Sequence, residues 1–414
     1  MQSLSFPRRK DGMGSEQPEQ IARRQLEDVI LPFWLENGID TEQGGFFTCF
    51  DNRGRRRLST DKFTWSQGRF VWLLARAARL AGRGLLALDP HPLVRHAERG
   101  ASFLLEHAVG PDGRCAYVLD EKGGPLAGER SVFADAFVAM GLAELTAHTG
   151  APDHLATIDL IVQRIADDVA AGDPPTPPYP LPPGCSGFGA RMIVLNARLD
   201  QVRAHLAASG RTPHLEELRA ARAAMLAHRE ASGLFTETFV ADPGMRDTIL
   251  ARHRTPGHAL EGTWMALEAG ELLGETGDDG DLVAGVSALC AAGWDDEHGG
   301  LFRYAGVSGR PYGGPYEELV RRTWSTKLWW VHTEAAYATR LAAVRYGDAE
   351  AAGWFDRIWA YTLRTFPGGA DGEEWVQIRD RTGAPLDEVV ALPVKDPYHI
   401  SRNLMQIIEL GDQR

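Results

Sequence analysis

The sequence predicts an all-α protein, a closed (α/α)6 barrel with short β-hairpin loops, and two observations lead to that prediction. The first is a repeat: five segments share a glycine-containing turn, a few aromatic or β-prone residues and a second turn. The second is that the residues between these segments have helical periodicity. Together the two observations indicate stacked helix pairs that bury a common core.

The repeat can be followed through its marker glycines, which are Gly45, Gly113, Gly233, Gly300 and Gly372. They follow one another at intervals of 68, 120, 67 and 72 residues. The long interval is nearly twice the short ones, so we expect a sixth segment near the proline-rich stretch 174–189 (PPTPPYPLPPGCSGFG). Six helix pairs in 414 residues favour a ring that closes on itself over an open solenoid.

The stretches between the turns are the predicted helices. Examples are 66–82 (SQGRFVWLLARAARLAG), 129–150 (ERSVFADAFVAMGLAELTAHTG) and 214–230 (HLEELRAARAAMLAHRE). Each repeat has room for two such helices and one loop. We expect residues 1–19 to form a disordered N-terminal tail and residues 20–414 to form a single barrel domain that carries the catalytic site.

The helices that follow the hairpin loops should all enter the barrel from the same end. Their first turns have unpaired N–H groups and a partial positive charge, so the shared mouth favours anions and developing negative charge. Functional side chains are therefore expected directly after these loops.

Four of these helix entrances carry polar and aromatic side chains. They hold Trp65 and Arg69 in the first, His258, Glu261 and Trp264 in the second, Lys327, Trp330, His332 and Glu334 in the third, and Asp396, His399 and Arg402 in the fourth. Arg69 lies within an apolar helix, where a buried guanidinium needs a partner. Asp396 is the predicted N-cap of the last helix, and His332 is expected to support the site rather than act as a base.

The histidine at the start of the second entrance (TPGHALEGTW) has two interpretations. Gly257 or His258 could cap the helix, with Glu261 bonding back as in a capping box. Alternatively His258 is a general base, because an imidazole titrates near neutral pH. A second first-turn histidine, His399, is predicted at the same end of the barrel. The pair favours the catalytic interpretation.

Composition excludes several classes of function. A net charge of −12 and a pI near 5.6 argue against binding a phosphate backbone, so we expect a small neutral or weakly anionic partner. The four cysteines form no CxxC pair, and no zincin, P-loop or dinucleotide-binding motif occurs. No metal site is therefore expected. The N-terminus has no apolar signal region and no stretch is long enough to span a membrane, which predicts a cytoplasmic protein.

At these entrances the chain resembles the N-acylglucosamine 2-epimerase family, whose superfamily also includes cellobiose 2-epimerases and mannose isomerases. The resemblance covers roughly residues 20–412. Its most specific stretches are GGFFTCFDNRG, TDKFTWSQGRFVW, TPGHALEGTW, GWDDEHGGLF, KLWWVHTEA and YHISR. The family's fold is an (α/α)6 barrel, in agreement with the repeat.

The resemblance also implies roles for individual residues. It makes His258 and His399 the proton-transfer pair, Glu261 the partner of His258, and Arg69 the group at the O1/O2 side of the sugar. The expected substrate-binding residues are Trp65, Trp264, Lys327, Trp330, Glu334 and Arg402. The resemblance implies no required cofactor, although family members are typically activated by a nucleotide such as ATP, and it leaves a homodimer open.

The implied reaction interconverts N-acetylglucosamine and N-acetylmannosamine through an enediolate. A mannose or other aldose–ketose isomerase of the same superfamily is the main alternative. The third repeat (GFGARMIVLNARLD) lacks the histidine that mannose isomerases and cellobiose epimerases tend to carry, which favours the N-acetylated substrate. More distant alternatives are a glycosidase using carboxylates such as Asp135, Glu261 or Glu334, and a non-enzymatic binding protein.

Overall fold

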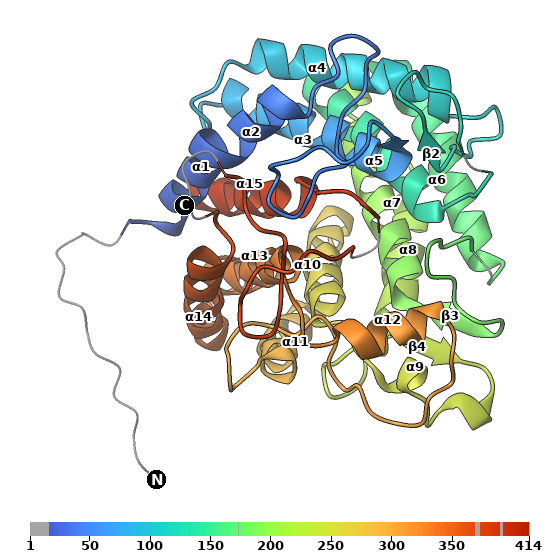
Figure 1. Cartoon of the computed structure of the whole chain (residues 1–414), viewed down its shortest axis with the longest axis vertical. Coiled ribbons are helices and arrows are strands. Elements are labelled where there is room, and N and C mark those ends of the chain that lie inside the picture. Colours follow the sequence, from blue (N-terminus) through green and yellow to red (C-terminus); the bar gives the residue numbers. More distant parts are fainter. Residues whose placement is uncertain (1–15, 127, 173, 369–372, 390–391, 414) are drawn as a thin grey trace.

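The computed structural model describes residues 16–126, 128–172, 174–368, 373–389 and 392–413. Helices dominate it, and within these residues the order of elements follows six helix pairs, each with an outer and an inner member (Figure 1). The inner helices are α3 (Thr64–Gly82), α5 (Val132–Thr149), α7 (Phe188–Ser209), α10 (Pro256–Leu273), α13 (Trp329–Arg345) and α15 (Tyr398–Asp412). The outer members are α1 (Pro18–Gln25) with α2 (Leu31–Asn37), which a π-helical turn joins into one, then α4 (Pro90–Phe103), α6 (Leu155–Ala170), α8 (Leu215–Leu226), α11 (Asp279–Gly293) and α14 (Ala349–Thr365).

The inner helices form a closed ring. Each packs against the next along the chain, from α3 to α5, α7, α10, α13 and α15, and α15 packs against α3. Figure 1 shows α15 lying between α3 and α13. The predicted (α/α)6 barrel is confirmed, and so is its closure.

The inner helices are buried around most of their circumference because they face both the barrel interior and the outer ring. Glycine permits the closest of these contacts. A Cβ atom at Gly68 on α3 would lie 2.3 Å from the backbone of Phe137 on α5, and one at Gly141 would lie 2.5 Å from the Gly68 oxygen. Any larger residue at either position would push α3 and α5 apart.

The loops at the mouth contain the predicted hairpins and also pair with one another. Isolated bridges close the turns at 39–46, 109–115, 229–235, 294–301 and 379–385. Three two-stranded antiparallel sheets then join neighbouring repeats: β1 (Lys62–Phe63) with β2 (Val118–Leu119), β3 (Cys185–Gly187) with β4 (Thr238–Val240), and β5 (Lys327–Leu328) with β6 (Ile378–Arg379). The expected sixth segment supplies β3. The marker Gly372 lies outside the described residues.

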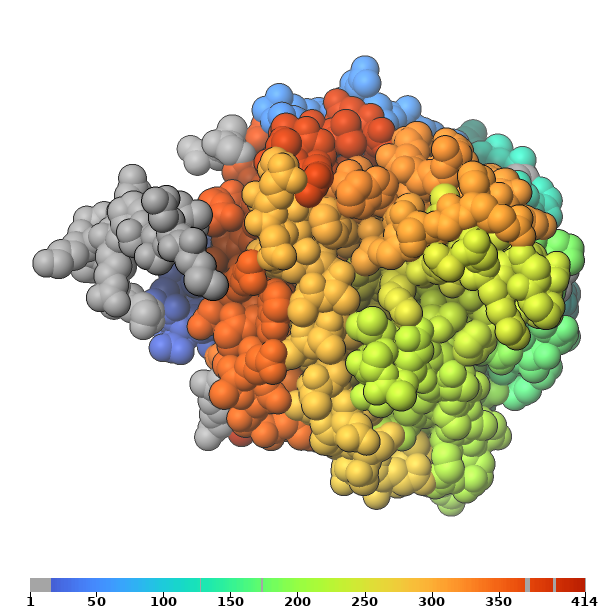
Figure 2. Space-filling model, turned by 90° about the horizontal axis from the view of Figure 1, so that it is seen from below, coloured from blue at the N-terminus to red at the C-terminus, as the bar shows by residue number. Residues whose placement is uncertain are grey.

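Two long loops add short helices at the mouth, α9 (Ile249–Arg252) and α12 (Pro315–Thr323). The backbone of Ile249 donates to the carbonyl of Arg310, and Ile249 packs with Tyr304 and Val320 in a small apolar cluster. Figure 2 shows these two segments packed side by side over one face of the molecule.

The chain's first described helix begins inside the region predicted as tail. Helix α1 starts at Pro18, continues through a π-helical turn into α2, and packs against α15. Residues 1–15 of the predicted tail lie outside the described residues. Among the described helices, none is both long enough and apolar enough to cross a membrane.

Candidate active site

A cavity of about 290 Å³ opens at the end of the barrel where the inner helices begin. This is the end predicted from the converging helix N-termini. Six of the predicted site residues line the cavity: Trp65, Arg69, His258, Glu261, Trp330 and His399. The structure therefore brings together residues that are more than 300 positions apart in the sequence.

His258 lies in the first turn of α10, but it does not cap that helix. The helix begins at Pro256 with Thr255 as its N-cap, which rules out the alternative interpretation in which Gly257 or His258 caps the helix. The imidazole Nδ1 lies 3.0 Å from Oε1 of Glu237, in the loop before β4. A carboxylate only accepts hydrogen bonds, so Nδ1 is the donor and Nε2 carries the lone pair of the neutral ring.

The Glu237 carboxylate also controls the protonation of His258. Burial by itself would lower the pKa of His258, but the charge of Glu237 and its hydrogen bond outweigh that effect, so the pKa is raised above the ordinary value. Burial likewise favours the neutral form of Glu237, and the charge of His258 reverses this and lowers the pKa of Glu237. The pair is thus an ionised carboxylate holding an imidazole in one tautomer.

His399 has a similar arrangement built from other elements. Its Nδ1 lies 2.7 Å from Oε1 of Glu334 on α13. Its Nε2 lies 3.1 Å from Nη2 of Arg69 on α3. Because a guanidinium can only donate, Nε2 accepts that hydrogen bond and Nδ1 donates to Glu334. His399 is therefore also a carboxylate-backed imidazole with its basic nitrogen at Nε2.

The expected start of the last helix is shifted by one residue. Helix α15 begins at Tyr398 with Pro397 as its N-cap, so Asp396 is not the N-cap. Asp396 Oδ1 still accepts from the backbone N–H of Tyr398, at 2.9 Å. The other carboxylate oxygen accepts from Arg69, which answers the need of that buried guanidinium for a partner.

Trp330 lies between the two histidines. Its ring centroid is 5.4 Å from that of His258 and 5.4 Å from that of His399. Gly257 makes room for the indole, since a Cβ atom there would lie 2.6 Å from Trp330 Cζ3. The glycine before the catalytic candidate thus lets α10 approach Trp330 of α13, so that His258 of α10 and His399 of α15 both lie against the same indole.

Glu261 lines the cavity but is not hydrogen-bonded to His258, which corrects the predicted pairing. Its carboxylate accepts from Nη2 of Arg402 on α15 instead. The same Nη2 donates to Oε1 of Glu334 at 2.6 Å. Burial favours the neutral form of Glu334, but Arg402 and His399 hold the pKa of this carboxyl well below its ordinary value.

Four residues predicted to bind substrate lie outside the described lining of the cavity. They are Trp264, Lys327, Glu334 and Arg402. Glu334 and Arg402 form the layer behind His399, and Trp264 Nε1 donates to Oε2 of Glu334 at 2.9 Å. Their positions support a role in orienting the cavity residues, not direct contact with substrate.

Lys327 is buried beneath the mouth and holds a loop in place. Its Nζ lies 3.1 Å from Asp295 Oδ2 and 3.3 Å from the oxygen of Gly300. Burial lowers the pKa of Lys327 to about 8. In the first repeat, Lys62 contacts Asp40 at 2.8 Å and the oxygen of Gly44 in the same way. Both lysines precede an inner helix and secure its hairpin loop.

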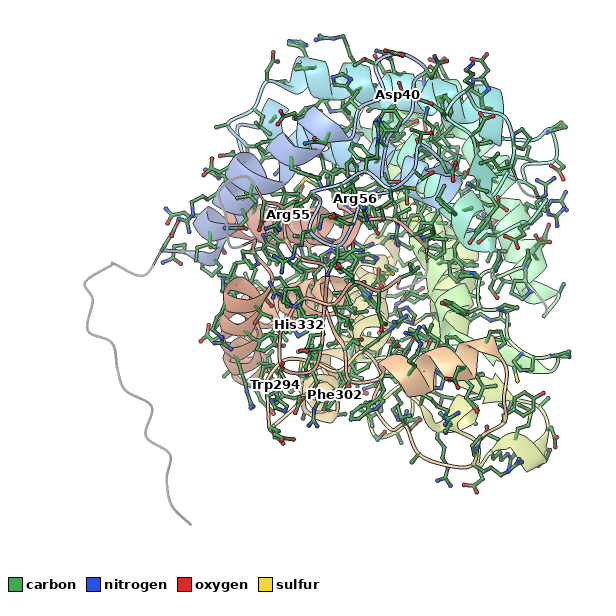
Figure 3. The ribbon with its side chains drawn as sticks, in the orientation of Figure 1. Asp40, Arg55, Arg56, Trp294, Phe302 and His332 are labelled. Carbon is green, nitrogen blue, oxygen red and sulfur yellow. The ribbon has the colours of Figure 1, made fainter. Side chains whose placement is uncertain are left out.

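His332 is a supporting group, as predicted. It belongs to α13 and is labelled in Figure 3. Its ring is stacked on Tyr361 of α14, with 5.1 Å between the ring centroids. Its Nδ1 donates to the oxygen of Leu328 at 2.7 Å, and its Nε2 accepts from the backbone of Leu301 at 2.9 Å. Burial lowers the pKa of His332 to about 3, so the ring stays neutral.

The carboxylates of Glu261 and Glu334 and a nitrogen of His399 are close enough together to hold a metal ion. Arg402 donates to both carboxylates and lies 3.3 Å from His399 Nδ1. The guanidinium thus already supplies the positive charge that this group of ligands would otherwise attract.

Sequence reasoning missed Glu237 and Arg303, both of which line the cavity. Each is a lone charged residue in an otherwise uncharged part of a mouth loop, LFTETF for Glu237 and GGLFRYAG for Arg303. That pattern is a usable signal, because a charge embedded in a buried segment requires a partner or a ligand.

The closed barrel, with two carboxylate-backed histidines facing one cavity, defines an α/α-barrel enzyme equipped for proton transfer. Comparisons with known proteins agree. The sequence model of the N-acylglucosamine 2-epimerase (GlcNAc 2-epimerase) family matches residues 45–402. The chain belongs to this family and is an isomerase of the epimerase type.

Individual relatives cover nearly the whole chain. The N-acylglucosamine 2-epimerase of Bos taurus is 30% identical over 396 residues, 94% of this chain and 89% of the relative. The cellobiose 2-epimerase of Bacteroides fragilis is 22% identical and covers 94% of this chain and 98% of the relative. The solved cellobiose 2-epimerase of Bacillus thermoamylovorans has the same fold, with a TM-score of 0.75 at 18% identity over 94% of this chain and 98% of that one.

Proposed function

We propose that this protein interconverts N-acetylglucosamine and N-acetylmannosamine by removing and returning the proton at C2. The observation that carries the proposal is the pair of imidazoles on one cavity, each with its Nδ1 bonded to a carboxylate, so that Nε2 is the basic nitrogen of both rings. The Nε2 of His399 accepts from Arg69 until substrate displaces it. Epimerisation requires a proton to leave one face of C2 and another to arrive on the opposite face. Two bases from α10 and α15 meet that need.

The chemistry begins after ring opening, when the aldehyde makes the C2 proton acidic. One imidazole Nε2 takes this proton, and the electron pair of the C–H bond forms a C1–C2 double bond while O1 gains the negative charge of the enediolate. In this proposal Arg69 and the converging N–H groups stabilise that charge. The other imidazole, protonated, then delivers a proton to the opposite face, which restores the aldehyde with inverted C2.

The wall formed by α7 supports an N-acetylated substrate. Its residues that line the cavity include Gly189, Ala190, Met192 and Ile193, and none of these has a polar side chain. A hydrophobic wall suits the methyl group of an acetamide better than a hydroxyl group. An aldose–ketose isomerase acting on mannose, the main alternative, has no such observation in its favour.

A glycosidase is disfavoured by the positions of the carboxylates. Of the three candidates, only Glu261 is among the described residues that line the cavity, and it is bonded to Arg402. Asp135 is buried and accepts from the backbone of Cys115 at 2.7 Å. Acid–base cleavage needs two carboxyl groups flanking the scissile bond, and the other two described carboxylates of the cavity, Glu237 and Asp396, are bonded to His258 and Arg69.

We further propose that the reaction uses no metal or cofactor as a reactant. Arg69 would stabilise the negative charge of the enediolate, and Arg402 already neutralises the carboxylates of Glu261 and Glu334. Activity should persist in EDTA. Activation by ATP and assembly into a homodimer stay predictions of the family resemblance, and a cytoplasmic location stays a prediction from the composition of the sequence.

The test is NMR of candidate sugars incubated with the protein in D2O. We expect N-acetylglucosamine to acquire deuterium at C2 while N-acetylmannosamine appears. Formation of a ketose would establish an isomerase instead, cleavage of a glycoside would establish a glycosidase, and an unchanged sugar would establish a binding protein.

A further inference from the structure

Two histidines and an aspartate converge on the outer side of the barrel. Asp159 belongs to α6, His205 to α7, and His214 directly precedes α8. The Nε2 atoms of His205 and His214 lie 2.9 Å and 3.5 Å from the same oxygen, Asp159 Oδ1. All three side chains are partly exposed, and none is among the described residues that line the catalytic cavity.

We propose that these three residues form a binding site for a divalent transition-metal ion of the Zn²⁺ class, separate from the catalytic site. Two imidazole nitrogens and a carboxylate oxygen are donors that Zn²⁺, Ni²⁺ and Cu²⁺ prefer, whereas Mg²⁺ and Ca²⁺ favour oxygen ligands throughout. Three protein ligands at a partly exposed position leave room for one or more waters.

The spacing of the donor atoms fits such an ion. Ligand atoms about 2.0–2.1 Å from a tetrahedral ion lie roughly 3.3 Å from one another. The two nitrogen-to-oxygen distances, 2.9 Å and 3.5 Å, lie on either side of that value. Small side-chain rotations would therefore bring all three atoms into coordination, because the donor atoms already lie within 4.8 Å of one another.

Neighbouring side chains orient the ligands as the surroundings of metal sites usually do. Gln201 Nε2 donates to Asp159 Oδ1 at 2.6 Å, and Arg198 holds the Gln201 amide by donating to its oxygen at 3.0 Å. The other ring nitrogen of His214, Nδ1, faces Glu217 Oε1 at 3.6 Å. When an ion replaces the proton between Nε2 and Asp159, the Glu217 carboxylate can accept the N–H that then lies at Nδ1, as a carboxylate behind a histidine ligand commonly does.

The backbone at His214 distinguishes this cluster from an ordinary surface ion pair. Its φ of 66° is in the left-handed region, and among the described residues it is the one non-glycine residue with positive φ. A simple ion pair between mobile surface side chains needs no such conformation. Strained conformations of this kind persist where the surrounding structure holds them, often at ligand sites.

Binding of one ion would join α6, α7 and the start of α8, which belong to two successive repeats. An ion that binds only the folded chain stabilises it by mass action. We therefore expect the ion to raise the thermal stability of the protein and to leave catalysis unchanged.

The experiment is isothermal titration of ZnCl2 into the full chain, prepared without a histidine tag and freed of metal with a chelator. One ion should bind, and His205→Ala and His214→Ala should each weaken binding at least tenfold, with a smaller loss in Glu217→Gln. Zn²⁺ should raise Tm in the wild type and not in His205→Ala. MgCl2 should do neither.

His298→Ala is the matched control, because His298 forms a simple surface pair with Glu297 at 3.5 Å. It should bind Zn²⁺ like the wild type. Circular dichroism establishes folding, and His205→Asn and His214→Asn replace any alanine variant that fails to fold. No Zn²⁺ binding by the wild type at millimolar concentration would overturn the proposal. Undiminished binding by the double variant of His205 and His214 would also overturn it, because the ion would then be held elsewhere.

Discussion

Arg69 Nη2 lies 3.1 Å from His399 Nε2, so the nitrogen that would act as a base is hydrogen-bonded to the group that would stabilise the enediolate. In the free enzyme the lone pair on His399 Nε2 therefore accepts a hydrogen bond from Arg69 and is not free to take a proton. A substrate whose O1 and O2 accept from Arg69 would release that lone pair at the moment it is needed. Substrate binding and activation of the base would thus be coupled through a single guanidinium.

The two histidines should serve opposite faces of C2. Replacing either His258 or His399 with Ala should lower epimerisation by about 10²–10⁴. The remaining histidine should still exchange the proton on its own side, so in D2O one variant should label one epimer at C2 and the other variant the opposite epimer. NMR of each epimer incubated separately measures this.

Two results would contradict that division of labour. Near-normal epimerisation by His258→Ala would remove His258 from the mechanism. Equal loss of exchange from both epimers in both variants would mean that the histidines act as one unit, or that one of them chiefly opens the ring. His91→Ala is a suitable control, because His91 lies in the exposed first turn of the outer helix α4.

Glu237→Gln should shift the pH dependence of the reaction. The base form of His258 is the neutral ring, so activity that depends on it falls as pH drops through its pKa. Glu237 raises that pKa, so removing the carboxylate charge should lower it and move the acidic limb of kcat/KM to lower pH. The rate at the plateau should also fall, because the tautomer is less firmly held.

A pH–rate profile of Glu237→Gln measures both effects. Glu230→Gln is the matched control, since Glu230 belongs to the loop just before Glu237 and pairs with Arg254 instead of a cavity histidine. Its profile should keep the wild-type acidic limb. An acidic limb in Glu237→Gln that stays in place would show that Glu237 does not control the protonation of His258.

The sequence predicts the barrel far better than the contacts within the site, for a physical reason. Hydrophobic periodicity and turn residues are local properties of the sequence. The six repeats can therefore be recognised along the chain, and their number predicts the closed barrel. The partner of Glu261 is Arg402, which is 141 residues away. The family resemblance predicted that Glu261 pairs with His258, but nothing local in the sequence shows that Glu237 approaches His258 from the preceding loop.

A similar limit explains why Lys327 was predicted to bind substrate. A lysine inside a specific motif at a helix entrance has the same sequence pattern whether its ammonium enters the cavity or points beneath the loop. Only the three-dimensional structure shows that the Lys327 ammonium donates to Asp295. The equivalent contact of Lys62 with Asp40 identifies it as part of the repeat's architecture.

Arg69→Ala should slow C2 exchange from both epimers alike, because stabilising the enediolate serves both directions of the reaction. A loss of about 10²–10³ in kcat is typical when one such donor is removed. Arg69→Lys keeps the positive charge but cannot donate to Asp396 and His399 at the same time, as the planar guanidinium does. Its rate of exchange should therefore lie between those of the wild type and Arg69→Ala. Deuterium wash-in from each epimer measures the effect. A loss confined to one epimer would assign Arg69 to one base rather than to the intermediate.

Lys327→Met should lower stability without altering the substrate's contacts. The change removes one of the two cations that the buried carboxylate of Asp295 contacts and leaves it Arg381 and the backbone N–H groups of Glu297 and His298, so we expect a loss of roughly 3 kcal/mol in the free energy of unfolding. KM of the folded fraction should stay close to the wild-type value. Denaturant unfolding and steady-state kinetics together test this, with the exposed Lys122→Met as control. A large rise in KM at unchanged stability would restore the predicted substrate contact.

The last prediction concerns substrate choice: N-acetylglucosamine and N-acetylmannosamine should interconvert faster than glucose, mannose or fructose. The reason is the apolar face of α7, where an acetamide methyl group would contact Met192 and Ile193. Desolvating that methyl group is favourable, whereas a sugar hydroxyl placed there would lose its hydrogen bonds to water.

Ile193→Asn places a polar group on this wall and should reduce the preference for N-acetylated sugars. The preference is measured as the ratio of kcat/KM for N-acetylmannosamine to kcat/KM for mannose. Loss of one well-buried apolar contact is worth about 1–3 kcal/mol, or roughly 10–200-fold in that ratio. Val194→Asn is the control, because Val194 is the neighbouring residue on α7 and is not among the described residues that line this cavity. An unchanged ratio in Ile193→Asn would locate the acetamide elsewhere in the cavity. Faster conversion of mannose to fructose by the wild type would favour the isomerase and would make the absence of a histidine from the third repeat irrelevant to substrate choice.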